Sequence, residues 1–542
     1  MSPPDVKPPA AALGSNAKVT VEGSVWLGHS LELRQQTAPT ARTAFQFSAA
    51  LPGSGPLLAV DQIDVETSPS AMPATQLGWD LASTEQKLAI VDKGLTESYM
   101  IFGASGSGKT HFLMYLLRQM LALNGGDPQR KMGGLILDPK AALIDDVRRM
   151  LRIAGRLDDL VVINADDLAG QPAVNILDCS LDPVELGKVL ILAAQCAGAA
   201  ASDPFWFGAW ANLFKGAVPL LQWRDEVRLS MASLMDAVLS VEERDDGGSP
   251  LRRIQRIARE ARAALKTLSA DRRADMQIAI EAVEGFYRQE PKNVETVEML
   301  MRDAFGDFRG SKWRCYSGLA PNAPGGAASA FYDRIIDEGK IVLLSVSNEE
   351  MVMAKVICTI VKVLFQRAVL SRLQRVRRGE LKNFERMVML VADEYALVAT
   401  ELPGNPMGDG QFLSLCRQFG CMAILAAQSV NVLQSSSLKE HWKAVVSQCA
   451  AKVYMRLNDN ETAEEATKLA GEYDWYLTGR GTSQQKDGAG SSTNLEMRER
   501  KALPAAILTQ VLQLGQGAMV GSLDGKRTRD TVRFFQAPPT WD

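Results

Sequence analysis

Short hydrophobic runs recur along this 542-residue chain, and stretches with helical periodicity separate most of them. The main runs cover residues 99–102, 134–137, 160–163, 341–346, 387–392 and 422–426. Runs of four to six apolar residues bounded by polar turns are typical of strands that are buried on both faces. Helices between such strands cover both sides of a sheet, so the pattern predicts the α/β class with a mostly parallel sheet.

The N-terminal region and one later segment have a different pattern. Residues 1–16 are rich in Pro and Ala and are predicted to be a disordered tail. Residues 18–27 alternate with period two, which predicts a small β-rich module over about 17–80. Residues 84–91 follow Ser83 and predict a capped linker helix that leads into the first buried strand. The Gly/Ser/Gln-rich residues 479–493 predict a mobile loop.

Residues 200–325, between the third and fourth buried strands, have helical periodicity and almost no strand signal. We expect them to form an inserted all-α subdomain. Within it Arg252 and Arg256 belong to a basic stripe, interpreted as a solvated charged face, with a nucleic-acid contact as the alternative. The predicted organisation is a tail (1–16), an N-terminal module with its linker helix (17–95), the α/β domain in two parts (96–199 and 326–542), and the insertion (200–325).

Composition narrows the function classes. The chain is 46% hydrophobic and has a net charge of −3, so its surface is not the broadly basic face of a protein that coats DNA. Any nucleic-acid contact must be local or inside an assembly. No stretch reaches the roughly 18 to 20 apolar residues that span a bilayer, and the first residues lack the features of a signal peptide. We expect a cytoplasmic protein with no direct membrane span.

The most specific chemical signal is an eight-residue motif between the first buried strand and a helical stretch. It matches G-x-x-x-x-G-K-[ST], the phosphate-binding loop, and consists of Gly103, Ala104, Ser105, Gly106, Ser107, Gly108, Lys109 and Thr110. Glycines let successive N–H groups curl around phosphates, and the following helix adds its positive N-terminus. Lys109 is expected to reach the β- and γ-phosphates, and the Thr110 hydroxyl to bind Mg²⁺. The motif therefore predicts binding of ATP with Mg²⁺.

A second acidic element separates a hydrolase from other phosphate-loop proteins. Asp393 and Glu394 directly follow the hydrophobic run at 387–392. A carboxylate at a strand tip can hold Mg²⁺, and a second carboxylate beside it can polarise the attacking water. Asp393 fits the first role and Glu394 the second, which favours ATP hydrolysis over phosphoryl transfer to a metabolite.

The next strand supplies two further candidates. Gln428 follows the run at 422–426 and is expected at a strand tip beside Asp393 and Glu394, where an amide can sense the γ-phosphate and the attacking water. Arg417 lies eleven residues earlier, at the other end of that strand, too far from its own phosphates. It is interpreted either as an ordinary surface arginine or as an arginine finger for a neighbouring subunit.

Together these segments resemble the HerA/FtsK superfamily of ring ATPases, and most closely the type IV secretion coupling proteins of the TraG/TraD type. Besides the phosphate loop, Asp393–Glu394, Arg417 and Gln428, the matching segments are 136–140 with Asp138-Pro139-Lys140, 174–178, 203–206, 336–342, 451–457 and 462–463. The likeness spans about 97–470 in order. It implies a RecA-like, additional-strand P-loop NTPase fold and a homo-hexamer that holds DNA or a protein–DNA substrate in its channel.

The resemblance implies a motor that serves conjugation or type IV secretion, with secretion-system or relaxosome components as partners. Coupling proteins usually begin with transmembrane helices, whereas a soluble, partly β-like segment is expected here, so docking to the inner membrane through a partner is left open. The alternatives are a HerA-like cytosolic DNA translocase that works with a nuclease or defence partner, and a nucleotide-gated assembly or adaptor ATPase that moves no polymer.

Overall fold

The computed structural model places most of the chain. It describes residues 24–35, 79–164, 174–198, 204–224, 229–244, 250–310, 312–316, 330–346, 351–380, 386–401, 408–485, 488–523 and 526–534. Several predicted features fall partly or wholly outside these ranges. They are the tail at 1–16, the alternating residues 18–23, most of the N-terminal module, parts of the insertion at 200–325 and two residues of the segment at 479–493. Among the described residues, no helix is long and apolar enough to cross a membrane.

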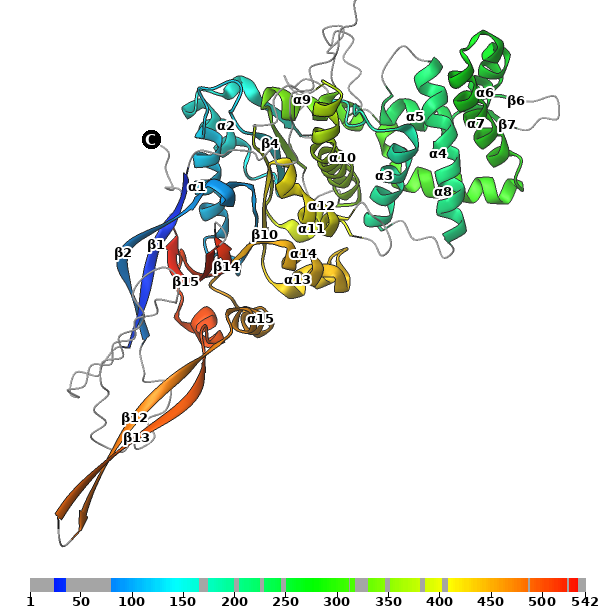
Figure 1. Cartoon of the computed structure of the whole chain (residues 1–542). Helices are drawn as coiled ribbons and strands as arrows, with labels where there is room; N and C mark the ends of the chain where they lie inside the picture. The colour runs from blue at the N-terminus through cyan, green and yellow to red at the C-terminus, as the bar shows by residue number, and fades with distance from the viewer. Residues whose placement is uncertain are drawn as a thin grey trace, which may run out of the picture.

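An eleven-stranded sheet forms the centre of the molecule (Figure 1), in the order β2-β1-β15-β14-β11-β3-β10-β9-β4-β8-β5. The seven strands from β11 to β5 run parallel, and the four from β14 to β2 extend the sheet antiparallel. The strands are β1 (Ser24–Gln35), β2 (Trp79–Val91), β3 (Ser98–Phe102), β4 (Gly133–Asp138), β5 (Leu160–Ile163), β8 (Ile341–Ser345), β9 (Val388–Ala392), β10 (Cys421–Ala427), β11 (Ala451–Met455), β14 (Gln516–Leu523) and β15 (Lys526–Phe534).

All six hydrophobic runs identified in the sequence are strands of the parallel region, as predicted. Their side chains alternate between two cores, because successive residues of a strand point to opposite faces. In β3, Met100 and Phe102 join one core, while Tyr99 and Ile101 join the other. Each fully buried Leu, Ile or Phe contributes about 1.5–3 kcal/mol, which is why strands with no polar face are stable only inside a covered sheet.

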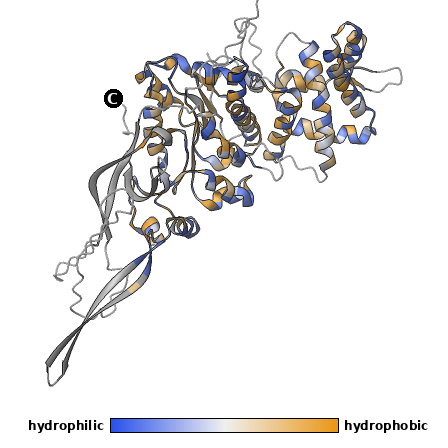
Figure 2. Ribbon diagram, viewed as in Figure 1, coloured by the Kyte–Doolittle hydropathy of each residue, from blue (hydrophilic) through white to orange (hydrophobic). Residues whose placement is uncertain are grey.

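Helices cover both faces. One face packs against α1 and α2, and the other against α10 and its neighbours (Figure 1). Hydrophobic and hydrophilic residues alternate along these helices (Figure 2), the pattern of elements that are half buried and half exposed. The helices are α1 (Lys109–Ala122), α2 (Ile144–Ile153), α3 (Pro183–Cys196), α4 (Pro204–Arg224), α5 (Met231–Leu239), α6 (Arg253–Ala264), α7 (Ala270–Tyr287), α8 (Pro291–Phe305), α9 (Phe331–Glu338), α10 (Met351–Arg377), α11 (Tyr395–Val398), α12 (Asp409–Leu415), α13 (Val430–Ser435), α14 (Trp442–Gln448) and α15 (Asn460–Ala470).

The predicted insertion is a separate helical lobe beside the sheet, formed by α4 to α8 (Figure 1). Helix α3 packs against both α4 and α10 and so joins the lobe to the α/β body. One detail differs from the sequence-based expectation, because the lobe also contains a two-stranded sheet of β6 (Val241–Arg244) and β7 (Pro250–Arg252). Three or four residues per strand are too few for a periodic signal in the sequence.

The linker helix predicted over residues 84–91 is wrong. These residues belong to β2, which pairs antiparallel with β1 from Ser24 opposite Val91 to Gln35 opposite Trp79. Only a short 3-10 helix, Asp92–Thr96, precedes β3. Pairing with β1 gives the backbone N–H and C=O groups of β2 the hydrogen bonds that a helix would have formed internally. Since β1 also pairs with β15, both strands extend the edge of the sheet.

The mobile loop predicted over residues 479–493 is also wrong. Residues 479–485 lie in β12 (Glu472–Gln485) and residues 488–493 in β13 (Gly488–Lys501), and the two strands form a long antiparallel ribbon that projects from the body below α15 (Figure 1). Its register runs without a shift from Glu472 opposite Lys501 to Gln485 opposite Gly488. Composition misled the prediction, because pairing of two 14-residue strands uses main-chain groups that even Gly and Ser supply.

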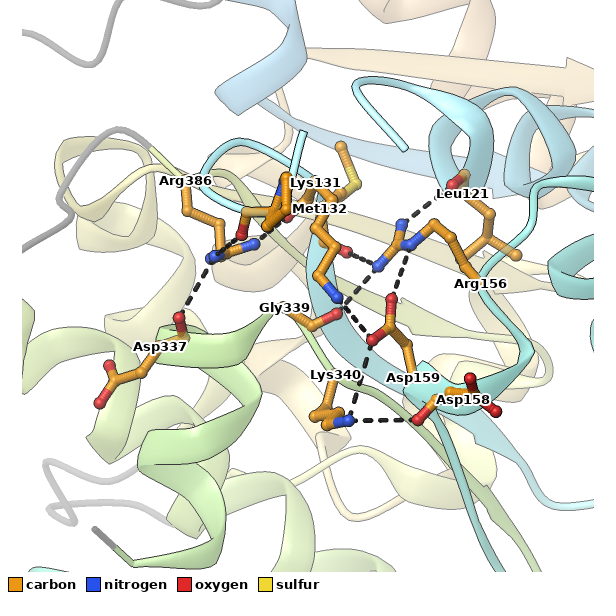
Figure 3. Close-up of polar contacts among 11 residues, drawn as sticks. Leu121, Lys131, Met132, Arg156, Asp158, Asp159, Asp337, Gly339, Lys340 and Arg386 are labelled. Carbon is orange, nitrogen blue, oxygen red and sulfur yellow. Dashed lines mark hydrogen bonds and ion pairs between the residues drawn. The ribbon is translucent and has the colours of Figure 1, made fainter. Parts of the chain in front are cut away.

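Buried arginines tie together the amino ends of the parallel strands (Figure 3). Arg156 donates to the carbonyls of Leu121, Met132 and Gly339 and to the carboxylate of Asp159, at distances of 2.7–3.0 Å. Arg386 donates to the carbonyls of Lys131, Pro128 and Asp337. Because these acceptors lie near the ends of α1 and α9 or just before β4, β5 and β8, the network fixes where the strands begin.

Candidate functional site

The phosphate-binding motif forms the turn between β3 and α1, as its position in the sequence predicts. Gly106 (φ 72°) and Gly108 (φ 96°) both have left-handed backbone conformations, which residues with a Cβ adopt at a cost. At Gly103 a Cβ would lie 2.5 Å from the Ser107 Oγ and 3.0 Å from the Met455 Cβ. The three glycines therefore permit a tight cradle at the N-terminus of a 14-residue helix.

Neighbouring strand tips hold this cradle in place. The Gly103 N–H donates to the carbonyl of Ala427 at the end of β10 (3.3 Å), and the Ala104 N–H donates to that of Arg456 just after β11 (2.9 Å). The Ser107 carbonyl accepts from the Gly515 N–H (3.3 Å). The first N–H groups of α1 have no partner within the helix, so they are available to an anion.

Lys109 lies over the cradle and is buried, with its Nζ 3.5 Å from the Ala104 carbonyl. Burial lowers the pKa of this lysine, and the repulsion from Lys140 lowers it further, while Glu394 and Asp393 oppose the shift. A buried ammonium group and the positive N-terminus of a helix repel each other, and an anion bound between them offsets this repulsion. The Ser107 Oγ is also buried, and among the described residues it has no hydrogen-bond partner. Both observations fit a phosphate in the cradle.

Asp393 lies at the tip of β9 next to the cradle. The Thr110 Oγ1 donates to the Asp393 Oδ2 at 3.1 Å. Burial raises the pKa of Asp393, and the adjacent Glu394 carboxylate raises it further, with the Thr110 hydrogen bond acting in the opposite direction. A hydroxyl and a carboxylate held together at a partly buried position are the oxygen ligands that Mg²⁺ takes in nucleotide sites. Thr110 and Asp393 therefore fit the metal roles predicted for them.

Glu394 directly follows and has a left-handed conformation (φ 52°), which a residue with a Cβ adopts at a cost of roughly 1–2 kcal/mol. Its buried carboxylate accepts from Lys140 Nζ (2.6 Å to Oε1) and from Gln428 Nε2 (3.4 Å to Oε1 and 3.3 Å to Oε2). Strained backbone conformations of this kind are found mostly at functional positions. The turn thus aims a carboxylate at the space between the tips of β4, β9 and β10.

A buried polar cluster supports the turn that carries Glu394. The Asp409 carboxylate accepts from Lys362 Nζ (2.6 Å), Tyr395 Oη (2.7 Å), Gln366 Nε2 (2.9 Å) and the Thr400 N–H (2.8 Å). The cluster joins α10 to α11, which begins at the residue after Glu394, and to α12. A charge pair that is nearly inaccessible to water and fully hydrogen-bonded fixes a single geometry. The sequence analysis did not identify it.

Gln428 lies where the sequence predicts, because β10 is inserted between the phosphate-loop strand β3 and the acidic strand β9. This is the strand order of the additional-strand P-loop fold. Arg417 lies before β10, at the opposite end of the strand, and the seven residues of β10 separate it from Gln428 by roughly 23 Å. Its half-exposed guanidinium pairs with Glu97 of the same chain at 3.1 Å.

Four predicted elements therefore converge at one edge of the sheet, and Arg417 lies at the other. The site also contains Lys140, to which the sequence analysis gave no role beyond its place in a family motif. The signal that could have identified it is its position two residues after the end of β4.

The basic stripe of the helical lobe is paired within the lobe. Arg252 contacts Glu298, and Arg256 contacts Glu242 and Glu260, which favours a structural interpretation of that stripe.

Comparisons with known proteins agree with this architecture. A family model described as "TraM recognition site of TraD and TraG" matches residues 388–513, which include Asp393, Glu394, Arg417 and Gln428. No curated protein matches the sequence.

Among solved structures, the chain is similar to the unbound bacterial conjugative coupling protein TrwBdeltaN70, with 14% identity and a TM-score of 0.55, over 83% of this chain and 89% of that one. Complexes of TrwB with the ATP analogue ADPNP (14% identity, TM-score 0.54) and with ADP and Mg²⁺ (13%, 0.51) are also similar, each over 82% of this chain and 88% of that one. The chain therefore has the fold of the conjugative coupling protein TrwB.

Proposed function

We propose that this protein is an ATP-hydrolysing motor that moves DNA, or a protein–DNA substrate, in the manner of a conjugative or type IV secretion coupling protein. The observation that carries the proposal is the convergence of the phosphate cradle, the Thr110–Asp393 pair, Glu394 and Gln428 on adjacent strand tips. A fold shared with TrwB, and a match to a region of TraD and TraG, support the choice of motor over switch.

The chemistry follows from the positions of these groups. The cradle and Lys109 would bind the β- and γ-phosphates of ATP, and Thr110 with Asp393 would hold Mg²⁺, which offsets the phosphate charge. Glu394 would take a proton from the attacking water, with Gln428 orienting it. Lys109 lies within electrostatic range of both carboxylates, as its lowered pKa and the opposing influence of Glu394 and Asp393 indicate.

The proposed assembly is a homo-hexamer, in which Arg417 acts on a neighbour. Its own phosphate cradle is at the opposite edge of the sheet, so Arg417 has no route to its own nucleotide. A guanidinium supplied in trans accelerates phosphoryl transfer by about 10³ to 10⁵. Secretion-system or relaxosome components are the proposed partners, and the proposed location is the cytoplasm, with docking to the inner membrane through a partner.

A mixing experiment tests the ring. Lys109→Ala subunits keep Arg417, and Arg417→Ala subunits keep an intact cradle, so mixed samples should regain ATP turnover that neither variant has alone. Wild-type turnover per subunit should also rise with protein concentration.

A second measurement tests the substrate. Single- or double-stranded DNA should stimulate turnover, and the stimulation should weaken with added salt, because salt competes for phosphate contacts. Turnover that is independent of concentration, is not rescued by mixing and does not respond to DNA would instead identify a nucleotide-gated adaptor that moves no polymer.

A further inference from the structure

Lys140 has no assigned role, yet its ammonium group makes a short contact with Glu394. The distance from Lys140 Nζ to Glu394 Oε1 is 2.6 Å, and the two residues are 254 positions apart in the sequence. The lysine side chain is 48% exposed, whereas that of the glutamate is only 8% exposed. A partly solvated cation therefore covers the carboxylate that the proposed reaction needs as a base.

The backbone turn that follows β4 holds Lys140 at this position. Asp138 Oδ2 accepts from the Leu143 N–H (2.7 Å) and from Ser345 Oγ (3.3 Å), which fixes the turn that follows β4. Within that turn Ala141 has a left-handed conformation (φ 53°), which is disfavoured for a residue with a Cβ. Because Leu137 pairs with Ala392, this strained turn faces the equally strained turn of Glu394.

The contact is incompatible with catalysis as it stands. Both carboxylate oxygens of Glu394 accept hydrogen bonds, Oε1 from Lys140 and Gln428, and Oε2 from Gln428. A carboxylate that is ion-paired at 2.6 Å leaves little room beside it for the attacking water. Lys140 must leave Glu394 before the reaction can proceed.

The geometry points to Lys140 as a further catalytic residue, which exchanges Glu394 for the γ-phosphate when ATP binds. This inference rests on the proposed ATPase function. Lys140 and Lys109 influence each other electrostatically, so both ammonium groups lie near the same cradle. A phosphate group offers several charged oxygens to an ammonium ion on a flexible stem, and transfer of Lys140 to them frees Glu394.

In the proposed reaction, water attacks the γ-phosphorus of ATP while Glu394 accepts a proton. The oxygen of water bonds to the γ-phosphorus, and the bond from that phosphorus to the β–γ bridging oxygen breaks. The water proton goes to Glu394 Oε1, which Lys140 has vacated, and ADP carries the electrons of the broken bond. Lys140 meanwhile neutralises negative charge on the γ-phosphate oxygens in the transition state.

The test is Lys140→Met, which keeps the stem and removes the charge. Turnover at saturating ATP should fall roughly 10²-fold, the usual cost of one transition-state contact. Binding of ADP, which lacks the γ-phosphate, should change less than about twofold. Retention of labelled ADP with Mg²⁺ and aluminium fluoride, which mimics the transferring phosphoryl group, should weaken at least tenfold by the same reasoning.

Two variants serve as controls. Lys140→Arg keeps a positive charge and should recover turnover to within about tenfold of wild type. Lys131→Met removes an equally close lysine–carboxylate contact, to Asp159 at the opposite edge of the sheet, and should change neither turnover nor fluoroaluminate trapping.

Turnover of Lys140→Met at or above the wild-type rate would overturn the proposal, because Lys140 would then only restrain Glu394. Equal losses of ADP and fluoroaluminate binding would also overturn it, since the residue would then shape the site as a whole. These outcomes are distinct from failure of the motor function. A wild-type enzyme that hydrolyses ATP without any response to DNA refutes the motor and leaves the role of Lys140 intact.

Discussion

The two edges of the parallel sheet use buried charge in different ways. At the amino ends of the strands, Arg156 and Arg386 donate to fixed main-chain carbonyls, and Arg156 also pairs with Asp159 (Figure 3). At the carboxyl ends, Lys140 and Gln428 contact Glu394, and every one of these contacts is between side chains. Main-chain acceptors cannot rearrange without unfolding, whereas side chains can exchange partners when a ligand arrives.

The difference distinguishes structural charge from functional charge in this fold. At the amino edge the guanidinium acceptors lie near the ends of α1 and α9 or just before β4, β5 and β8, far from the phosphate cradle, so removing the charge should affect stability alone. The carboxyl edge has a strained Glu394, an exposed Lys140 and a buried, unpaired Ser107 hydroxyl among the described residues. Removing charge there should affect turnover alone.

The largest expected effect is that of Glu394→Gln at the carboxyl edge. The amide keeps the shape of the side chain and loses the base, so turnover should fall by about 10² to 10⁴ while ATP binding is retained. Turnover and equilibrium binding of a fluorescent ATP analogue measure the two effects separately. Glu465→Gln, on the surface helix α15, is the matched control and should leave both unchanged. Loss of nucleotide binding together with turnover would show that Glu394 is structural.

The next effect is expected at the amino edge. Arg156→Met leaves Lys131 as the remaining hydrogen-bond partner of the Asp159 carboxylate and removes the buried guanidinium from it, and breaking such a buried pair costs about 3–5 kcal/mol in the free energy of unfolding. Denaturant unfolding measures this change. Turnover per folded molecule should equal that of the wild type. Arg148→Met, whose contact with the exposed Asp145 is 3.8 Å long, should cost no more than about 1 kcal/mol. Reduced turnover in folded Arg156→Met would mean that the two edges are not independent.

The smallest effect concerns the pH dependence of stability. Burial raises the pKa of Asp159, but hydrogen bonds from Lys131 and Arg156 outweigh it and bring the pKa below its ordinary value. A carboxyl with a depressed folded pKa stabilises the protein above its unfolded pKa of about 3.9, and the stabilisation is lost as the pH falls through the folded pKa.

The stability difference between the wild type and Asp159→Asn should therefore be constant from neutral pH to about pH 5 and shrink below about pH 4. Urea unfolding across this range measures it. Asp158→Asn, at an exposed neighbouring position, should parallel the wild type throughout. A difference that stays constant down to pH 2 would contradict the role given to the Lys131 and Arg156 hydrogen bonds.

The sequence by itself determined the parallel strands and most of the chemistry of the site. Uninterrupted hydrophobic runs identify strands buried on both faces, and the residue after each run lies at the carboxyl edge of the sheet. Asp393 and Gln428 could therefore be placed from local pattern alone, and the phosphate loop from its spacing. The helical lobe was also predictable, because amphipathic helices carry their own periodicity.

Only the tertiary structure decided the features that depend on distant partners. Residues 84–91 are part of β2 because β1 is available to pair with them. Residues 479–485 and 488–493 belong to a ribbon because β12 and β13 align in register. The contact of Lys140 with Glu394, across 254 positions of sequence, depends on β4 lying beside β9. The physical reason is that local pattern reports which face of an element is apolar, whereas backbone pairing and ion pairing depend on what the fold brings alongside.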